Sequence, residues 1–237
     1  MDYFRCHINE ISDISVGNPP VLRLILNYNR QYQGQAALRT LLQPLINSVL
    51  ANQDLHINTN PVEIYKTWIN RMEINSGQSC ELPPTVTPEE AMQYPEVKDT
   101  LNKALDELMS YVTLFLTSLF DMVEVLPYCM RHLLNVLRQS LCEKFPDCPN
   151  KEILKAVGHV LYYKYINSAI VAPEAYGVID VAYNNSLTQE QRKNLANIAK
   201  ILQFSVIKKG VSIMTLKFPL YLIKYIQTAF FKFLKSF

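Results

Sequence analysis

Apolar residues recur every three or four positions along most of this chain, which is the spacing of helices with one buried face. The alternation of apolar and polar residues that is typical of half-buried strands does not recur. The longest apolar stripe follows Pro95 and predicts a core helix of about seven turns. The residues that we expect on the inward faces are Leu38, Leu41, Leu42, Leu45 and Val49; Val97, Leu101, Ala104, Leu108, Val112, Phe115 and Leu119; Met130, Leu133, Leu134, Leu137 and Leu141; Ile153, Val157, Val160 and Leu161; and Leu195, Ile198, Ile201 and Leu202.

Residue types that favour helix starts stand before several of these stripes. An amide or hydroxyl side chain caps the first free backbone N–H groups, a proline fits the first helical position, and a carboxylate or amide follows three residues after the cap. The longest connection without a clear helical pattern runs from Asn75 to Pro95. We therefore predict an all-α fold, organised as one continuous bundle. The start signals are Asn60-Pro61-x-Glu63, which opens a helix through Met72; Thr87-Pro88-Glu89-Glu90, which opens a short turn; Asn150, which is expected to cap the next helix; and Thr188 with Gln191.

The composition is that of a folded protein with an uneven distribution of charge. Hydrophobic residues make up 49% of the 237 residues and charged residues 19%, which excludes a disordered, highly charged chain. The formal net charge of +2 hides two unlike parts, because nine of the 23 basic residues and none of the 21 acidic residues lie beyond Glu190. The first 190 residues therefore carry 14 basic and 21 acidic residues, a net charge of −7, and the remainder is basic and aromatic.

The last residues of the chain have the pattern of a basic amphipathic helix. Their apolar side chains recur at steps of three and four, and lysines lie off this stripe. Packing of this helix against the bundle is the preferred interpretation, and contact of residues 208–237 with an anionic membrane surface or an acidic partner is the alternative. Nucleic acid is not an expected partner, because a basic cluster without a groove-reading fold is weak evidence. The stripe consists of Ile223, Ile226, Phe230, Phe233 and Phe237.

The residue types that usually build catalytic or metal sites are not grouped along the chain. The six glycines are too dispersed for a phosphate-binding loop, no serine has the flanking glycines of a nucleophile elbow, and no two cysteines form a Cys-x-x-Cys pair. We therefore expect binding rather than turnover, with no metal and no cofactor. The five cysteines are interpreted as reduced and mostly buried. The histidines, expected at the surface or at helix ends, are His7, His56, His132 and His159.

One segment stands apart from this pattern: Leu161-Tyr-Tyr-Lys164-Tyr-Ile-Asn167-Ser168-Ala-Ile-Val-Ala-Pro173. Taken alone, it is typical of a helix C-terminus in which Asn167 satisfies free backbone groups and the aromatic residues belong to the core. It also resembles the signature of Ras GTPase-activating-protein (RasGAP) domains, Phe-Leu-Arg-Phe-Ile-Asn-Pro-Ala-Ile-Val-x-Pro. Together with the following Glu174-Ala-Tyr-Gly-Val-Ile-Asp180, it looks most like the version found in IQGAP scaffolds.

The resemblance covers most of the chain, from about residue 14 to residue 203. It lapses over 204–224 and resumes weakly over 225–237, so residues 1–203 are predicted to form a RasGAP-like helical domain and 204–237 a divergent basic helical segment. Family helices that precede the loop at 15–20 have no counterpart, so we expect an N-terminally incomplete copy of the domain with exposed apolar surface. The other stretches that carry the resemblance are Leu38-Arg-Thr-Leu-Leu-Gln-Pro44-Leu, Asn60-Pro-Val-Glu-Ile-Tyr-Lys-Thr-Trp68, Leu126-Pro-Tyr-Cys-Met-Arg131, Glu143-Lys-Phe-Pro-Asp147 and Gln191-Arg-Lys-Asn-Leu-Ala-Asn-Ile-Ala-Lys200.

The resemblance implies that the catalytic arginine of the family is replaced. In active members an arginine before a Gly-Asn pair enters the GTPase active site and neutralises charge that develops on the γ-phosphoryl group. The matching loop is Ser15-Val16-Gly17-Asn18-Pro19-Pro20, so the resemblance places Val16 at this finger position. Valine has neither a charge nor a side-chain donor and cannot supply the stabilisation. Arg23 and Arg30 lie a helical turn or more beyond the loop and are less favoured substitutes.

Two further positions depart from the family signature. Lys164 corresponds to the second family arginine, and a lysine keeps the charge but loses the planar fork that grips two acceptors. Ser168 stands where the family has proline. The resemblance therefore implies a RasGAP fold that is not an enzyme.

The IQGAP resemblance implies binding of GTP-loaded Rho-family small GTPases, of the Rac and cell-division-cycle type, within a cytoskeletal scaffold whose other segments are further candidate partners. We expect a cytoplasmic location at the cell cortex or actin cytoskeleton, since no signal-peptide pattern opens the chain. The alternatives are an active activator of a Ras-type GTPase and a helical interaction fragment without GTPase binding. Lys200 matches a family groove lysine and would face acidic GTPase surface; its plainer interpretation is a solvated helix lysine. The residues expected to line the groove are Val16, Gly17, Asn18, Lys164, Asn167, Lys200 and Gln203.

Overall fold

The computed structural model of the chain describes residues 8–11, 13–14, 20–29, 32–120, 125–180 and 187–207. All regular elements within these ranges are helices, which confirms the predicted all-α class. The predicted C-terminal helix at 223–237 and the finger loop at 15–19 lie outside the described residues. The elements are α3 (Pro20–Asn29), α4 (Tyr32–Ala51), α5 (Pro61–Ser76), α6 (Pro88–Ala91), α7 (Pro95–Phe120), α9 (Tyr128–Lys144), α10 (Asn150–His159), the π-helix η1 (Val160–Ile166), α11 (Asn167–Val171) and α12 (Gln189–Ile207).

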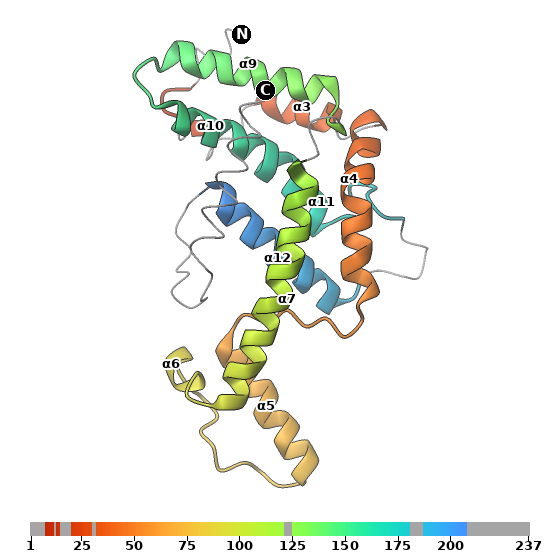
Figure 1. Cartoon of the computed structure of the whole chain (residues 1–237), viewed down its shortest axis with the longest axis vertical. Helices are drawn as coiled ribbons and strands as arrows, with labels where there is room; N and C mark the ends of the chain where they lie inside the picture. Colours follow the sequence, from red (N-terminus) through yellow and green to blue (C-terminus); the bar gives the residue numbers. More distant parts are fainter. Residues whose placement is uncertain are drawn as a thin grey trace.

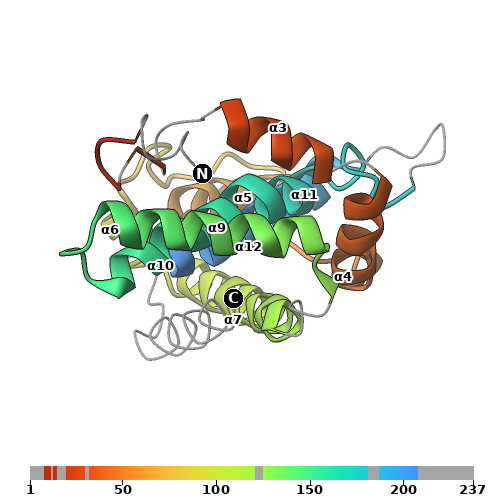
Figure 2. The same cartoon turned by 90° about the horizontal axis from the view of Figure 1, so that it is seen from above.

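The helices form an elongated body with α7 as its longest member (Figure 1). The upper part contains α3, α9 and α10, the middle contains α4, α11 and α12, and the lower end is made by α5 and α6 against the start of α7. Seen from above, α3 and α7 lie on opposite sides, with α9 and α12 between them (Figure 2). Helix α12 contacts α4, α7, α10, α11 and η1, so it occupies the centre of the bundle.

Two apolar cores lie along this axis. The larger one is built by α3, α4, α9, α10, η1, α11, α12 and the second half of α7. The smaller one is built by α5, α6, the first turns of α7 and the loop before α6. Every residue expected on an inward stripe is buried except Leu41, which is half-buried against the larger core. The helical period therefore identified the buried faces correctly.

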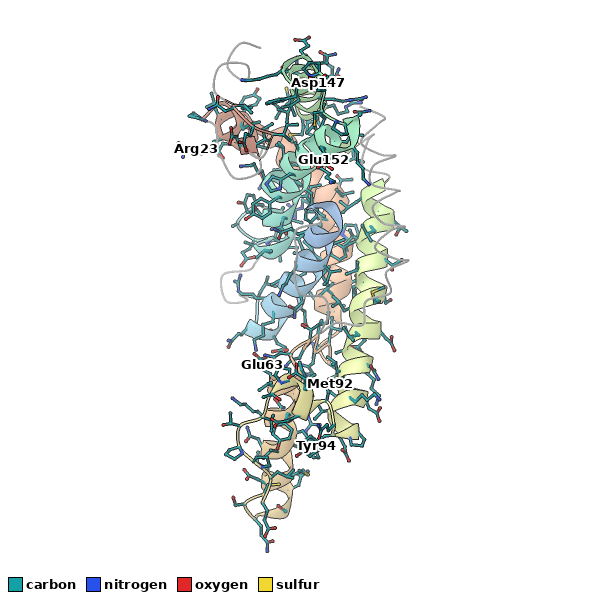
Figure 3. All side chains as sticks on the ribbon, turned by 90° about the vertical axis from the view of Figure 1, so that its left-hand side faces the viewer. Arg23, Glu63, Met92, Tyr94, Asp147 and Glu152 are labelled. Atoms are coloured by element: carbon teal, nitrogen blue, oxygen red, sulfur yellow. The ribbon has the colours of Figure 1, made fainter. Side chains whose placement is uncertain are left out.

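Aromatic packing holds the smaller core together. The ring of Tyr65 lies 5.0 Å from that of Tyr94, and the Trp68 ring lies 5.9 Å from the first and 5.4 Å from the second. The Tyr65 hydroxyl donates to the Pro83 carbonyl at 3.0 Å, and burial raises the pKa of Tyr65 to about 12. These contacts fix the long connection after α5, which has little backbone hydrogen bonding of its own. Figure 3 shows Tyr94 and Met92 at this lower end, with Asp147 and Glu152 at the opposite end.

Most of the predicted helix starts are confirmed. Asn60 accepts the Val62 N–H at 3.0 Å, and α5 continues past Met72 to Ser76, where Gly77 adopts a left-handed φ of 67°. Thr87 with Glu90 and Thr188 with Gln191 both form reciprocal capping boxes. These signals are reliable because a cap involves only residues two or three apart.

The predicted cap at Asn150 is wrong. Asn150 is the first residue of α10, and Pro149 precedes the helix in the capping position. The Pro149 carbonyl accepts the Glu152 N–H at 2.8 Å, and its φ of −54° already suits a helix start. The start of α10 therefore has no side-chain cap, and the position before it is taken by a proline whose backbone angle suits a helix start.

The expected burial of cysteines and exposure of histidines is partly wrong. Cys129 and Cys142 are exposed, because they lie on α9 outside its inward stripe, and Cys80 and Cys148 are half-buried.

Among the histidines, His56 and His132 are exposed as expected, but His159 is buried, and its ring stacks at 4.9 Å on that of Tyr163. His159 is buried because it lies at the junction of α10 and η1, where the chain packs against the core. His7 and Cys6 lie outside the described residues.

A buried amide on α12 ties the extended segment before α5 to the bundle. The Asn194 amide nitrogen donates to the Leu55 carbonyl at 2.6 Å, and its oxygen accepts the Ile57 N–H at 2.9 Å. The Asn197 amide donates to the Ile57 carbonyl at 2.6 Å. Leu55, Ile57 and Asn194 are all buried, so these bonds satisfy backbone groups that water does not reach.

Replacing Asn194 with alanine is expected to lower the free energy of unfolding by about 2 to 3 kcal/mol, because a buried N–H group and a buried C=O group each lose their partner. Urea unfolding followed by circular dichroism measures the change. Asn102→Ala, at an exposed position of α7, is the control and is expected to stay within about 0.5 kcal/mol of the parent. Equal losses in the two variants would contradict the proposed anchoring.

Candidate functional site

The unusual segment around Lys164 forms a π-helix followed by one short α-helix. In η1 the backbone turns more widely than an α-helix, and the Asn167 N–H donates to the Tyr162 carbonyl five residues earlier. π turns are rare in proteins, and those that do occur are often found at functional sites. The segment runs between α10 and α12, and it contacts both. The sequence pattern predicted a helix end here and did not reveal the π turn.

Two of the three tyrosines of this segment belong to the core. Tyr162 and Tyr165 are buried, as the helix-end interpretation predicted, whereas Tyr163 is 41% exposed. The Tyr162 hydroxyl donates to the Ala199 carbonyl of α12 at 2.9 Å, with the Asn167 side-chain oxygen at 3.4 Å as a longer second acceptor. Burial raises the pKa of Tyr162 well above its usual value, so its proton stays in place at neutral pH.

The Tyr162 hydroxyl joins the two described parts of the predicted groove. Asn167 follows η1 directly, and Lys200 follows Ala199 on α12. Lys164 and Asn167 are half-buried, Lys200 is exposed, and Gln203 is half-buried one turn beyond it. Partial burial lowers the pKa of Lys164. The structure therefore brings η1 and α12 into contact, and a single groove lined by these residues stays a prediction.

The remaining predicted site residues are not described. Val16, Gly17 and Asn18 of the finger loop lie outside the described residues, as does Arg30. Arg23 lies on an exposed position of α3, a helix that packs against α4 and α9 (Figure 3).

Ion pairs hold the loop that follows α11. The Glu174 carboxylate pairs with Arg192 at the start of α12, and Asp180 pairs with Arg39 of α4. Between them Gly177 has a φ of 62°, and a Cβ at this position would collide with the side chain of Gln35. The loop is thereby fastened to the two helices that flank the candidate site.

Sequence reasoning missed the Tyr162 bond and both loop ion pairs. A signal for the first was present, because the family signature has phenylalanine where Tyr162 stands, and a buried phenolic hydroxyl needs a partner. The ion pairs join residues far apart in the sequence and had no local signal.

The chain matches a family model described as GTPase-activator protein for Ras-like GTPase over residues 6–205. The chain belongs to the RasGAP family. It is 41% identical over 205 residues to the human Ras GTPase-activating-like protein IQGAP2 and 38% identical over 208 residues to human IQGAP3. A Dictyostelium discoideum relative, Ras GTPase-activating-like protein rgaA, is 30% identical over 197 residues.

These matches cover most of this chain and a small part of the relatives. The alignments cover 86% and 88% of the chain for the two human proteins and 83% for rgaA. They cover 13% of each human protein and 23% of rgaA, so the chain corresponds to one region of longer proteins. The family membership and the all-α fold of this RasGAP region are thus shown directly.

The chemistry of the described site suits contact with a partner. Lys164 and Lys200 provide positive charge, and Asn167 and Gln203 provide amide groups that donate and accept hydrogen bonds.

Within the described ranges, no three His, Cys, Asp or Glu side chains are grouped as a metal site would require. None of the described helices has the length and apolar character needed to cross a membrane.

Replacing Tyr162 with phenylalanine is expected to lower the free energy of unfolding at neutral pH by about 1 kcal/mol, the usual net contribution of one hydrogen bond. Because the folded state raises the pKa of Tyr162, its contribution is present below pH ~10 and is lost as pH rises further. The parent should therefore lose more stability than the variant between neutral pH and pH ~11 in urea titrations.

Tyr28→Phe is the matched control for this experiment, because Tyr28 is 68% exposed on α3. It should stay within about 0.5 kcal/mol of the parent at neutral pH. A Tyr162→Phe variant as stable as this control would show that the hydroxyl does not join η1 to α12.

Proposed function

We propose that this chain is a non-catalytic RasGAP module that binds GTP-loaded Rho-family small GTPases, of the Rac and cell-division-cycle type, as part of an IQGAP-like cytoskeletal scaffold. The observation that carries the proposal is the junction of η1 with α12, where the buried Tyr162 hydroxyl donates to the carbonyl of Ala199, the residue before Lys200. A preformed arrangement of this kind lowers the entropy lost when a partner binds. The expected cellular location is cytoplasmic, at the cell cortex or actin cytoskeleton.

A small-GTPase partner is supported by the relatives named above, which are called Ras GTPase-activating-like proteins, and the match to them spans the signature segment and the start of α12. The choice of a Rho-family partner rests on the resemblance of the signature segment to the IQGAP version. Lys164 and Lys200 would face acidic surface on the GTPase, where complementary charge mainly raises the association rate.

The absence of catalysis is argued from chemistry at the finger position. Acceleration of GTP hydrolysis needs a cation that stabilises charge developing on the transferred phosphoryl group. Val16 has an uncharged side chain without a donor, so it cannot supply that interaction. Binding depends on a wider surface and does not need this group, so loss of the finger removes catalysis and leaves binding.

The binding proposal is tested by a pull-down with a Rac-type GTPase loaded with either GDP or a non-hydrolysable GTP analogue. The parent chain should retain the GTP form and release the GDP form. Lys200→Glu should weaken binding of the GTP form about fivefold, because it places like charge against an acidic surface. Lys164→Glu should weaken it at least as much, since this side chain is half-buried within the site.

The matched control is Lys151→Glu, which reverses an exposed lysine at the start of α10. It should leave binding unchanged, because it lies on another helix and an acid near a helix N-terminus is favourable for folding. Equal retention of both nucleotide forms by the parent, or no retention of either, would overturn the proposal and favour a helical fragment without GTPase binding.

Catalytic inactivity is tested by single-turnover GTP hydrolysis with an excess of this chain over the GTPase. The rate should stay within about twofold of the GTPase alone, since an arginine finger normally supplies a factor of about 10³ to 10⁵. A rate increase above about tenfold would overturn the inference that Val16 at the finger position leaves the domain without catalysis. Arg23→Ala would then show whether Arg23 replaces the finger.

A further inference from the structure

A cleft of about 570 Å³ lies where the larger core gives way to the smaller one. Its walls come from the segment before α5, from α5 itself, from the first half of α7 and from the start of α12. The volume falls in the range of clefts that hold ligands or peptide side chains. Figure 3 places Glu63, one of its lining residues, at the upper end of α5. The lining residues that matter here are His56, Asn58, Lys66, Trp68, Arg71 and Lys193.

The cleft is built by buried bonds and does not depend on chance side-chain positions. Asn194 and Asn197 of α12 bind the backbone of Leu55 and Ile57. These bonds fix the positions of His56 and Asn58, which line the cleft. Trp68, which also lines the cleft, is half-buried and packs against Tyr65 and Tyr94. Its ring is therefore an apolar part of the lining held in a fixed position.

The cleft carries more available positive than negative charge. The Glu190 carboxylate already contacts the His56 ring at 3.3 Å and lies 4.0 Å from the Lys193 ammonium, and Glu63 accepts the Asn58 amide at 3.3 Å. By contrast, Lys66 and Arg71 are exposed and make no ion pair with any described residue. The wall formed by α5 therefore presents Lys66 and Arg71, which no described ion pair neutralises, beside the charged Glu63 carboxylate. With Lys193 and Glu190 included, the lining has three cations and two carboxylates, a formal net charge of +1 with His56 neutral.

The cleft lies on the same face of α12 as the candidate site. Lys193 and Lys200 are seven residues apart, so they lie on one side of the helix about 10 Å apart along its axis. Both are exposed. A standard interface of about 800 Å² per partner is roughly 30 Å across, so a protein centred near Lys200 extends about 15 Å from it and covers Lys193 at the edge of the cleft.

We propose that this cleft is a second contact site for the protein that binds at Lys200, and that it takes an acidic segment carrying an apolar side chain. This rests on the proposed function. The carboxylates of the segment pair with Lys66 and Arg71, its backbone meets the polar rim at His56 and Asn58, and its apolar side chain covers Trp68. The α5 cations thereby extend the binding surface and add to the salt dependence of association.

The test compares binding of a Rac-type GTPase, loaded with a non-hydrolysable GTP analogue, to four chains: the parent, the Lys66→Glu/Arg71→Glu double variant, Lys200→Glu and Lys151→Glu. Calorimetry at low and high salt measures each Kd. The double variant should bind about tenfold more weakly at low salt and depend less on salt than the parent. A Lys66→Gln/Arg71→Gln variant, which removes charge without reversing it, should show a smaller loss with an unchanged circular dichroism spectrum.

The possible failures are distinguishable. If Lys200→Glu weakens binding and the double variant binds like the parent, the second contact site is wrong and the proposed function stands. If the parent itself binds neither nucleotide form, both proposals fall. If inorganic pyrophosphate binds the parent and not the double variant while GTPase affinity is equal in both, the cleft is a small-anion site and the proposed acidic segment is wrong.

Discussion

Helix α12 has to bury one face against five neighbouring helical elements, α4, α7, α10, η1 and α11, and it is the helix through which these elements meet. Its apolar stripe forms part of the larger core, but a stripe of this kind has no directional preference by itself. Direction comes from polar groups on the same helix. Asn194 binds the segment before α5, Arg192 binds the loop after α11, and the Ala199 carbonyl accepts the Tyr162 hydroxyl. The segment before α5, the loop after α11 and η1 are therefore all positioned against one helix.

In the proposed function, this alignment connects stability to recognition. The Asn194 and Ala199 bonds of α12 lie on its buried side, where their partners are shielded from water and their loss is costly. Its exposed side carries Lys193 and Lys200, whose backbone positions are set by those buried bonds. Cations on a fixed helix are held at a constant spacing, whereas cations on a mobile loop are not. A partner with complementary acidic groups therefore meets a surface that is already formed.

Binding and catalysis place different demands on such a fold. Most single side chains in a protein–protein interface change the affinity little when they are exchanged, because a few of the contacts supply most of the binding free energy. Phosphoryl transfer needs a charge beside the reacting oxygen atoms, and a neutral side chain at that point leaves the rest of the surface intact. In the proposed function, this difference explains how a member of the RasGAP family with Val16 at the finger position keeps a lysine-bearing groove.

Local patterns in the sequence were sufficient for most of the fold. The stripe of Val97 to Leu119 identified α7, and the capping boxes at Thr87 and Thr188 identified two helix starts, because periodicity and capping involve residues within a turn or two. The resemblance to the family also named Lys164 and Asn167 in the signature and Lys200 and Gln203 on α12 as candidate groove residues. The misassigned cap at Asn150 involved a choice between adjacent residues, and the free energies of such alternatives differ little.

The sequence alone determined the helical class, the buried faces and the RasGAP signature. The tertiary structure decided that Asn194 reaches backbone groups 137 and 139 residues away, that the Tyr162 hydroxyl ends on α12, and that Lys66, Arg71 and Lys193 surround one cleft. A helix pattern states which face is apolar but not which other helix covers it, since apolar contact is nondirectional. Pairings between distant segments arise only when the whole chain packs, so they leave no periodic or short-range mark in the sequence.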